Sequence, residues 1–361
     1  MAGRDGTDER DGADVQDGAD VQDGADVQDG TDGGGDAVGS GPPVVQALRA
    51  RLLSDMGEVL PAHRSWIALD FPMHLNCGDS ALHLGLEAVA AERGARVTRI
   101  LDRRSYRSDL LDPGSLPVSM AGGTWGGLYP THHELRLRFL RDTRGRDAVQ
   151  MPQSIEHVDE RHREELRRAV GEHGRFTFLV RDRRSYDIAV RDYDCEVRLV
   201  PDLAFALGAL PRGTAGRPLV VQARTDREAG GVEGFEETFD WITAPPRSRS
   251  AVLLRLARRL NAQQRRTGAR PVAVAARTAM RALARANLQR ACSMLSVGER
   301  VVTDRLHGHV ISTLLGIPHV VVNDRFGKVR ALHETWTAED PGTSFAASWS
   351  EVPEALARLG R

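Results

Sequence analysis

The sequence is almost without lysine. It holds 49 basic residues, and because Lys328 is the only lysine, the other 48 are arginines. A strong coding bias is the simplest cause of such a replacement, so the one remaining lysine is a candidate for a specific role. Lys328 follows an apolar run and a short turn. The alternative, a surface residue retained by chance, stays open at this point.

Cysteines, aromatic residues and long apolar runs are also scarce. The three cysteines are far apart, odd in number and outside any Cys-x-x-Cys pattern, which argues against a disulfide framework and a zinc site. Aromatic residues make up 5% and do not alternate with basic clusters, so a nucleic-acid partner is not supported. No apolar stretch of roughly 18 residues and no N-terminal signal region is present. These features predict a soluble, cytoplasmic protein.

The N-terminus has the composition of a disordered segment. Residues 11–28 are three copies of the hexad DGADVQ, and residues 1–40 hold 12 acidic residues against two arginines, a net charge of −10. We expect residues 1–42 to form a disordered, acidic tail. The whole chain has a net charge of −1, so residues 41–361 carry +9. A basic folded part suits an anionic ligand, although the arginine bias alone gives the same excess.

From about residue 44, short β-branched runs alternate with longer amphipathic runs. Because parallel strands need crossover connections and helices supply them, this alternation predicts parallel sheets. We expect an α/β protein with two Rossmann-like domains, residues 43–210 and 211–361, facing a cleft. Strands are expected at 65–71, 95–102, 147–154, 175–182, 300–304 and 317–324. A further strand is expected to begin at residue 116 and run into the glycine-rich loop, and the second half starts with RPLVVQARTD (217–226). Helices are expected at 76–94, 132–143, 159–173, 250–265, 276–291 and 307–316.

Several polar motifs fall where expected strands end, which is where open α/β sheets bind ligands. In NCGDSAL, Asn76 and Asp79 are candidates for an acceptor-sugar or anion site, and a plain helix cap is the alternative. In AGGTWGGLYP, two glycine pairs flank Trp125, which favours a sugar-stacking site over ordinary turn glycines. No G-x-G-x-x-G or phosphate-binding loop ending in Gly-Lys-Ser/Thr is present.

The motif TDRLHGH is the sharpest of these signals. It delivers Arg305 and His307 to the first turn of an expected helix. Free N–H groups and the fork of an arginine form an anion site there, and the histidine can exchange protons with a bound ligand. The alternative is a structural arginine beside a capping histidine. The motifs PQS, RDRRSYD (with Arg181) and PDLAF also end strands, but each alone could be an ordinary turn.

Eight motifs follow one another along the chain: NCGDSAL, GGTWGGLYP, PQSI, RDRRSY, PDLAF, RTDRE, TDRLHGHVISTLLGIPHVVVND and GKVRALHETW. In this order they resemble the polysaccharide pyruvyl transferase family, over about residues 66–336. The glycine-rich loop departs slightly from the family's usual pattern. The resemblance implies a two-domain fold like that of the GT-B glycosyltransferases. It also implies an enzyme that uses phosphoenolpyruvate to place a pyruvate ketal across two hydroxyls of a sugar, in a cell-surface polysaccharide or its lipid-linked precursor.

The resemblance also assigns roles to residues. It places Arg305 and Arg181 on donor-binding arginines and His307 on the acid. From the residues themselves, we expect Lys328 in the same donor pocket, Asp79 to orient or deprotonate the acceptor, and Asn76 and Trp125 to lie beside the sugar. Neither a metal nor another cofactor is expected, and membrane contact would be peripheral, through the acceptor. The alternatives are a GT-B-like glycosyltransferase using a nucleotide sugar and a non-catalytic glycan-binding relative.

Overall fold

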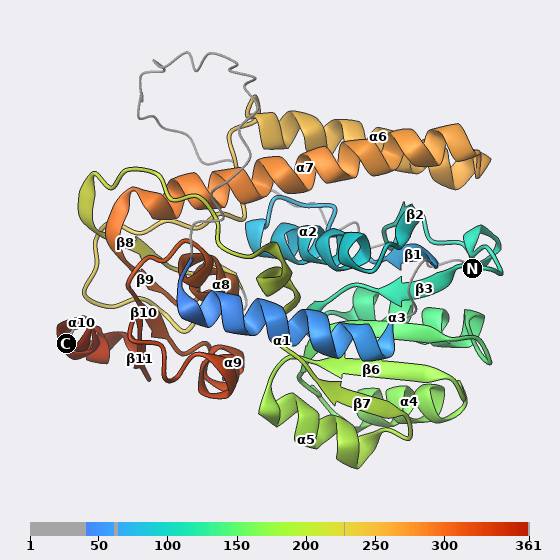
Figure 1. The fold of residues 1–361 in the computed structure, drawn as a ribbon, viewed down its shortest axis with the longest axis horizontal. Helices are drawn as coiled ribbons and strands as arrows, with labels where there is room; N and C mark the ends of the chain where they lie inside the picture. The colour runs from blue at the N-terminus through green and yellow to red at the C-terminus, as the bar shows by residue number, and fades with distance from the viewer. Residues whose placement is uncertain (1–40, 61–63, 227, 360–361) are drawn as a thin grey trace, which may run out of the picture. The chain divides into compact units, whose positions relative to one another are not determined.

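The computed structural model describes residues 41–60, 64–226 and 228–359, and the predicted acidic tail lies outside this range. Two parallel sheets organise the described chain (Figure 1). The first half of the chain forms a seven-stranded sheet and the second half a four-stranded one. The expected α/β class with parallel sheets is confirmed. The described residues between 41 and 359 cluster as one compact unit, and the division near residue 210 stays a prediction.

The seven-stranded sheet has the order β2-β1-β3-β5-β6-β7, and β4 pairs with β5 beside this path. Its strands are parallel throughout. They are β1 (Ser65–Leu69), β2 (Arg96–Leu101), β3 (Leu116–Ser119), β4 (Gly122–Trp125), β5 (Ala148–Ile155), β6 (Phe176–Val180) and β7 (Glu196–Leu199). The chain runs from β1 outward to β2 and then returns to β3 on the other side of β1. This reversal opens a crevice at the carboxyl ends of β1 and β3.

The four-stranded sheet has the order β11-β10-β9-β8 and is also parallel. Its strands are β8 (Arg217–Gln222), β9 (Gly298–Thr303), β10 (His319–Val322) and β11 (Thr343–Ala346). Its core is rich in valine, as expected for strands covered on both faces. Helices α8 (Leu306–Leu314), α9 (Lys328–Trp336) and α10 (Val352–Arg358) belong to this half, with the 3-10 turn η3 (Trp349–Glu351).

The remaining helices cover the first sheet and bridge to the second. They are α1 (Pro43–Val59), α2 (Cys77–Glu92), α3 (Pro130–Asp142), α4 (Glu160–Gly171), α5 (Arg183–Asp192), α6 (Arg249–Thr267) and α7 (Arg270–Ser296), with the 3-10 turns η1 (Ser108–Leu110) and η2 (Leu203–Leu207). The long helices α6 and α7 pack on each other, and α7 packs against α2 (Figure 1). A helical pair from the second half of the chain thus lies over the first sheet.

Helix α2 approaches η2 very closely. A Cβ on Gly85 would collide with the carbonyl oxygen of Leu203, so only glycine permits this contact. The contact fixes the middle of α2 relative to the PDLAF segment, which precedes and includes the first residues of η2.

Most expected elements are present, and the differences are local. The expected elements lack α1, β7, α9, α10 and β11, and the RDRRSYD segment was expected at a strand end, where the structure begins α5 with Asp182 as its cap. The glycine-rich loop contains the short strand β4. No helix in the described residues is both long enough and apolar enough to span a membrane.

Candidate active site

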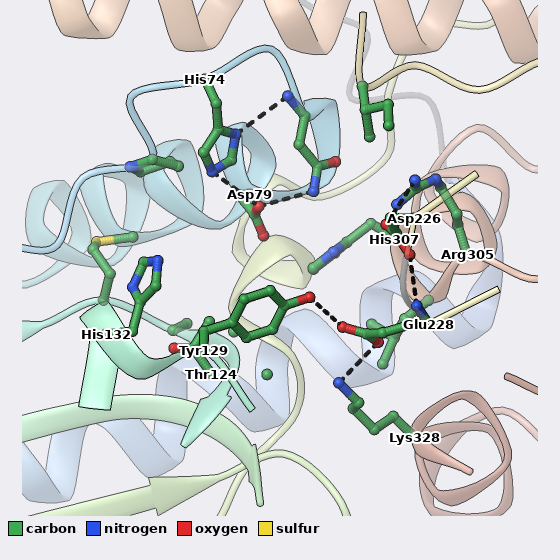
Figure 2. A pocket seen from close by; sticks show the side chains of 18 of the residues that line it. His74, Asp79, Thr124, Tyr129, His132, Asp226, Glu228, Arg305, His307 and Lys328 are labelled. Atoms are coloured by element: carbon green, nitrogen blue, oxygen red, sulfur yellow. Dashed lines mark hydrogen bonds and ion pairs between the residues drawn. The ribbon is translucent and has the colours of Figure 1, made fainter. Parts of the chain in front are cut away.

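A cavity of about 340 Å³ opens beyond the carboxyl ends of strands from both sheets. Figure 2 shows side chains that line it. Six of the seven side chains singled out in the sequence line it, namely Asn76, Asp79, Arg181, Arg305, His307 and Lys328. Residues without a prior assignment also contribute, among them Asp70, His74, Thr124, Tyr129, His132, Arg224, Asp226, Glu228 and Asp324. The cavity therefore combines several cations, several carboxylates and three histidines.

Arg181 follows β6 and is held on two sides. Its Nε donates to Ser154 Oγ at 2.9 Å and its Nη1 donates to Asp202 Oδ2 at 2.8 Å. Both partners are buried, as is Arg181 itself. The remaining nitrogen, Nη2, lies beside Gly123 at the cavity wall. Ser154 of the PQS motif thus positions Arg181, so this motif does more than form a turn.

Lys328 reaches the same glycine from the second half of the chain. A Cβ on Gly123 would stand 3.4 Å from Lys328 Nζ and 3.4 Å from Arg181 Nη2. The two cations therefore converge on one point of the cavity, and the absence of a side chain at residue 123 leaves that point open. Lys328 is the first residue of α9 and is buried. It is not a surface residue.

Glu228 balances much of this positive charge. It accepts hydrogen bonds from Lys328 Nζ at 2.9 Å and Tyr129 Oη at 2.6 Å, and it pairs with Arg224 Nη2 at 3.2 Å (Figure 2). Burial acts to raise the pKa of Glu228, but the charges of Lys328 and Arg224 outweigh it and lower the pKa. Since Tyr129 belongs to the first half of the chain, this carboxylate also links the two halves across the cavity.

Arg305 is placed differently from the sequence expectation. Its fork is engaged by protein carboxylates: Nε and Nη2 bond both oxygens of Asp240 at 2.6 Å, and Nη2 also bonds Asp226 Oδ2 at 3.0 Å. Of the three nitrogens of this guanidinium, only Nη1 has no acceptor among the described residues. The bidentate grip expected for a ligand is thus occupied by Asp240, which the sequence reasoning did not identify.

His307 lies in the first turn of α8, with its ring against the first turn of α2. Its Nε2 is 3.6 Å from Asp202 Oδ2, an ion-pair distance rather than a hydrogen bond. A Cβ on Gly78 would come within 2.5–2.6 Å of the His307 ring and its Cβ, so the ring fits only beside glycine. Burial acts to raise the pKa of Asp202, but His307 and Arg181 outweigh it and lower the pKa. A buried carboxylate thus stands behind His307.

Asn76 and Asp79 form the rim of the cavity at the start of α2. Asn76 caps the helix by accepting from the Gly78 N–H at 3.2 Å, as the alternative reading of the motif had it. Its amide also donates to Asp79 Oδ2 at 2.9 Å, and His74 Nε2 lies 3.5 Å from the same oxygen. Both residues line the cavity as well, so capping and a ligand contact do not exclude each other.

A His–Asp pair absent from the sequence reasoning stands on the same rim. His132 Nδ1 lies 2.9 Å from Asp70 Oδ2, and Arg136 Nη1 bonds the same oxygen at 2.6 Å. Asp70 follows β1 and has a φ of 67°, a left-handed conformation that non-glycine residues rarely adopt. Burial acts to raise the pKa of Asp70, but Arg136 and His132 outweigh it and lower the pKa.

Trp125 does not line the cavity, which corrects its expected role as a sugar-stacking platform. Its side chain is 1% exposed and packs with Phe176, Phe178 and Tyr193, and its Nε1 donates to Tyr193 Oη at 2.8 Å. It lies on strand β4, where neighbouring side chains point to opposite faces. Thr124 therefore faces the cavity and Trp125 faces the core.

Known proteins similar to this chain show its family. Residues 76–324 match the family profile described as polysaccharide pyruvyl transferase. The chain belongs to this family. The matched segment begins at Asn76 and includes Arg181, Arg305 and His307, while Lys328 lies four residues beyond its end.

Two similar proteins have "pyruvyl transferase" in their names. Pyruvyl transferase 1 of Schizosaccharomyces pombe is 29% identical over 298 residues, covering 74% of this chain and 68% of that protein. The Bacillus subtilis protein named "Putative pyruvyl transferase EpsO" is 27% identical over 297 residues, covering 81% of this chain and 91% of that protein. The family member described here is thus similar to transferases over most of its length.

A solved structure shares the fold. The crystal structure of KP1_0663 from Klebsiella pneumoniae superposes with a TM-score of 0.54 and covers 83% of this chain and 99% of its own. At 16% identity the likeness concerns architecture alone.

Proposed function

We propose that this transferase moves the pyruvyl group of phosphoenolpyruvate onto two hydroxyls of a sugar, forming a ketal and releasing phosphate. The observation that carries the proposal is the convergence of Arg181 Nη2 and Lys328 Nζ on the open point at Gly123. Phosphoenolpyruvate carries a carboxylate and a phosphate, and two cations at one point suit such a donor. We propose that protein cations meet the donor's charge without a metal or another cofactor.

The roles of the cations follow from their contacts. Arg181 and Lys328 bind the donor directly, because each is fixed by buried partners yet lines the cavity. Arg305 acts mainly through its positive charge and Nη1, because its fork is held by Asp240 and Asp226. Such fixed charges stabilise the phosphate as it leaves without reorganising during the reaction.

His307 is proposed as the acid. It protonates carbon 3 of the donor, which makes carbon 2 electrophilic, and Asp202 stabilises the imidazolium before the transfer. One sugar hydroxyl adds to carbon 2, the carbon–oxygen bond to phosphate breaks, and the second hydroxyl closes the ketal. One of the two hydroxyl protons replaces the proton that His307 gives to carbon 3. The other leaves on the phosphate, so the protons balance.

His132 is proposed as the group that accepts the hydroxyl protons. Asp70 holds its Nδ1, which leaves Nε2 as the nitrogen able to accept a proton. Asp79, the expected base, has one oxygen engaged by Asn76 and His74, so we assign it and Asn76 to orienting the sugar. The acceptor is proposed to be a cell-surface polysaccharide or its lipid-linked precursor.

The proposal extends to the architecture and the location. Two parallel sheets facing one cavity fit two Rossmann-like domains in the GT-B manner, with the boundary near residue 210. The reaction would run in the cytoplasm, where phosphoenolpyruvate is made.

The test separates this reaction from glycosyl transfer. Purified protein is incubated with a panel of free and lipid-linked saccharides and either phosphoenolpyruvate or nucleotide sugars. We expect acceptor-dependent phosphate release from phosphoenolpyruvate and a gain in acceptor mass of one pyruvyl group. Sugar transfer from a nucleotide donor, with no binding of phosphoenolpyruvate by calorimetry, would show the proposal to be wrong.

A further inference from the structure

A second, larger cavity adjoins the candidate active site. Its volume is about 680 Å³, and it shares Asp70, Pro72, His74 and His132 with the first cavity. The two therefore meet at the His132–Asp70 pair. A ligand placed across this junction would have one end among the residues of the first cavity and the other in the second.

Arginines dominate the walls of the second cavity. Six line it: Arg103, Arg104, Arg107, Arg258, Arg265 and Arg266. Among the described residues, Arg107 is the only one of the six that pairs with a carboxylate, Asp109. The two acids that line the cavity, Asp70 and Asp102, are buried and already hydrogen-bonded. The cavity thus presents unneutralised positive charge.

The two walls that carry these arginines are joined rigidly. One wall is the segment after β2, and the other is α6, on which Arg258, Ala262 and Arg265 share one face by their spacing. Between the walls, Asn261 Nδ2 donates to Asp102 Oδ1 at 2.6 Å, and Gln264 Nε2 donates to the carbonyl of Ile100 at 2.9 Å. All the side chains in these two bonds are buried, so the cavity is built on a fixed frame.

The arginine bias of the sequence does not by itself explain this surface. Helix α4 is also rich in arginine, but three of its four arginines pair with a glutamate of the same helix. By contrast, residues 249–296, which span α6 and α7, hold eleven arginines and no acidic residue. A bias that replaces lysine with arginine would leave the accompanying acids in place. Their absence here is a local property of this helical pair.

We infer that the second cavity binds the diphosphate of a glycosyl diphosphate acceptor, while the attached sugar lies at the His132 junction and presents its hydroxyls to the first cavity. The inference rests on the proposed function. Unpaired guanidinium forks match phosphate oxygens bidentately, and several of them suit a polyanion better than a neutral sugar. A lipid diphosphate sugar and a nucleotide diphosphate sugar share this chemistry.

The first measurement is calorimetric titration with inorganic pyrophosphate in the presence of saturating phosphoenolpyruvate, which fills the donor site. Arg265→Gln/Arg266→Gln should weaken pyrophosphate binding at least about tenfold. The matched control is Arg259→Gln/Arg270→Gln, which removes the same charge from the same helical pair outside the cavity lining and should leave affinity within about twofold, by screening of remote exposed charges. Equal losses in both variants, or no binding in the wild type, would overturn the inference.

A second titration distinguishes the sources of the diphosphate. The probes are UDP-N-acetylglucosamine and N-acetylglucosamine diphosphate carrying a short farnesyl chain. We expect one of them to bind more tightly than pyrophosphate, with the preferred probe losing affinity in the Arg265→Gln/Arg266→Gln variant only. If neither probe binds, the inference is wrong.

Titration with phosphoenolpyruvate alone keeps the two proposals apart. If the donor binds and pyrophosphate affinity is equal in all variants, the second-cavity inference fails and the proposed function stands. If the donor does not bind but the cavity variants still lose pyrophosphate, the donor assignment fails instead.

Discussion

The two adjoining cavities handle positive charge in opposite ways. In the first, Arg181, Arg224, Arg305 and Lys328 are each paired with a buried or half-buried carboxylate. In the second, most arginines are exposed and make no ion pair with the described residues. The first arrangement is a fixed network, and the second is a set of charges in contact with water.

This difference follows from the cost of burial. A buried charge loses its hydration and is tolerated only when a partner compensates it, so the cations of the first cavity come with Glu228, Asp202, Asp226 and Asp240. Exposed arginines keep their hydration and need no partner. We therefore assign the proposed chemistry to the first cavity, where groups are fixed before the ligand arrives, and the proposed salt-sensitive attraction of an anion to the second.

Removing the acid should give the largest effect in the first cavity. His307→Gln keeps the size of the side chain roughly but cannot donate a proton as imidazolium does. We expect turnover to fall by about 10²-fold or more, with phosphoenolpyruvate affinity unchanged by calorimetry. Near-normal turnover would move the acid role to another residue.

Displacing the acid without removing it should have a smaller effect. In Gly78→Ala, the new Cβ would stand 2.5–2.6 Å from His307, which must shift. We expect turnover to fall about tenfold, because a misplaced catalytic group loses much of its rate advantage. Gly171→Ala is the matched control, since a Cβ there has open space. Equal activities in the two variants would contradict a fixed position for His307.

Substitution of Lys328 tests how much space the ion-paired side chains of the first cavity leave around this residue. Arginine at residue 328 keeps the charge and can still meet Glu228, but a guanidinium is broader than the ammonium that now lies beside Gly123 and Arg181. We expect Lys328→Arg to lower turnover several-fold, with the melting temperature changed by only a few degrees. Wild-type turnover in this variant would leave coding chance as the reason for the lysine.

The Arg305→Lys variant distinguishes two roles for this arginine, binding of the donor and stabilisation of the ion-pair network of the first cavity. Lysine cannot reproduce the bidentate bond to Asp240, and loss of a hydrogen bond to a charged group costs about 1.5–3 kcal/mol of folding stability. We expect a melting temperature lower by several degrees and a less than tenfold loss of phosphoenolpyruvate affinity. A large loss of affinity at an unchanged melting temperature would show that Arg305 grips the donor directly.

Much of the fold and part of the site could be predicted from the sequence, because those signals are local. Strand and helix periods repeat over a few residues, and TDRLHGH places Arg305 and His307 at a strand-to-helix turn within one motif. In a parallel sheet, the carboxyl ends of all strands lie at one edge, where ligands bind. This rule predicted that the candidate residues gather at one site, and six of them line one cavity.

The features that the sequence could not reveal depend on distant contacts or on the face of a strand. Asp70 and His132 are 62 residues apart, and Tyr129 and Glu228 are 99 apart, so only the topology brings them together. The expectation for Trp125 was wrong because the glycines around it indicated a loop, whereas the structure has a short strand there. Neighbouring side chains of a strand point to opposite faces, so Trp125 points away from the cavity.

The smallest expected effect concerns the acidic segment at the N-terminus. Deleting residues 1–40 changes the net charge from −1 to +9 but removes no residue of the matched segment, which begins at residue 76. Since the paired network of the first cavity supplies its own carboxylates, we expect turnover and melting temperature to stay nearly unchanged. The unpaired arginines of the second cavity respond to long-range charge, so pyrophosphate affinity at low salt should rise modestly and the difference should vanish at high salt. A several-fold loss of turnover in the shortened protein would show that the acidic segment takes part in the chemistry.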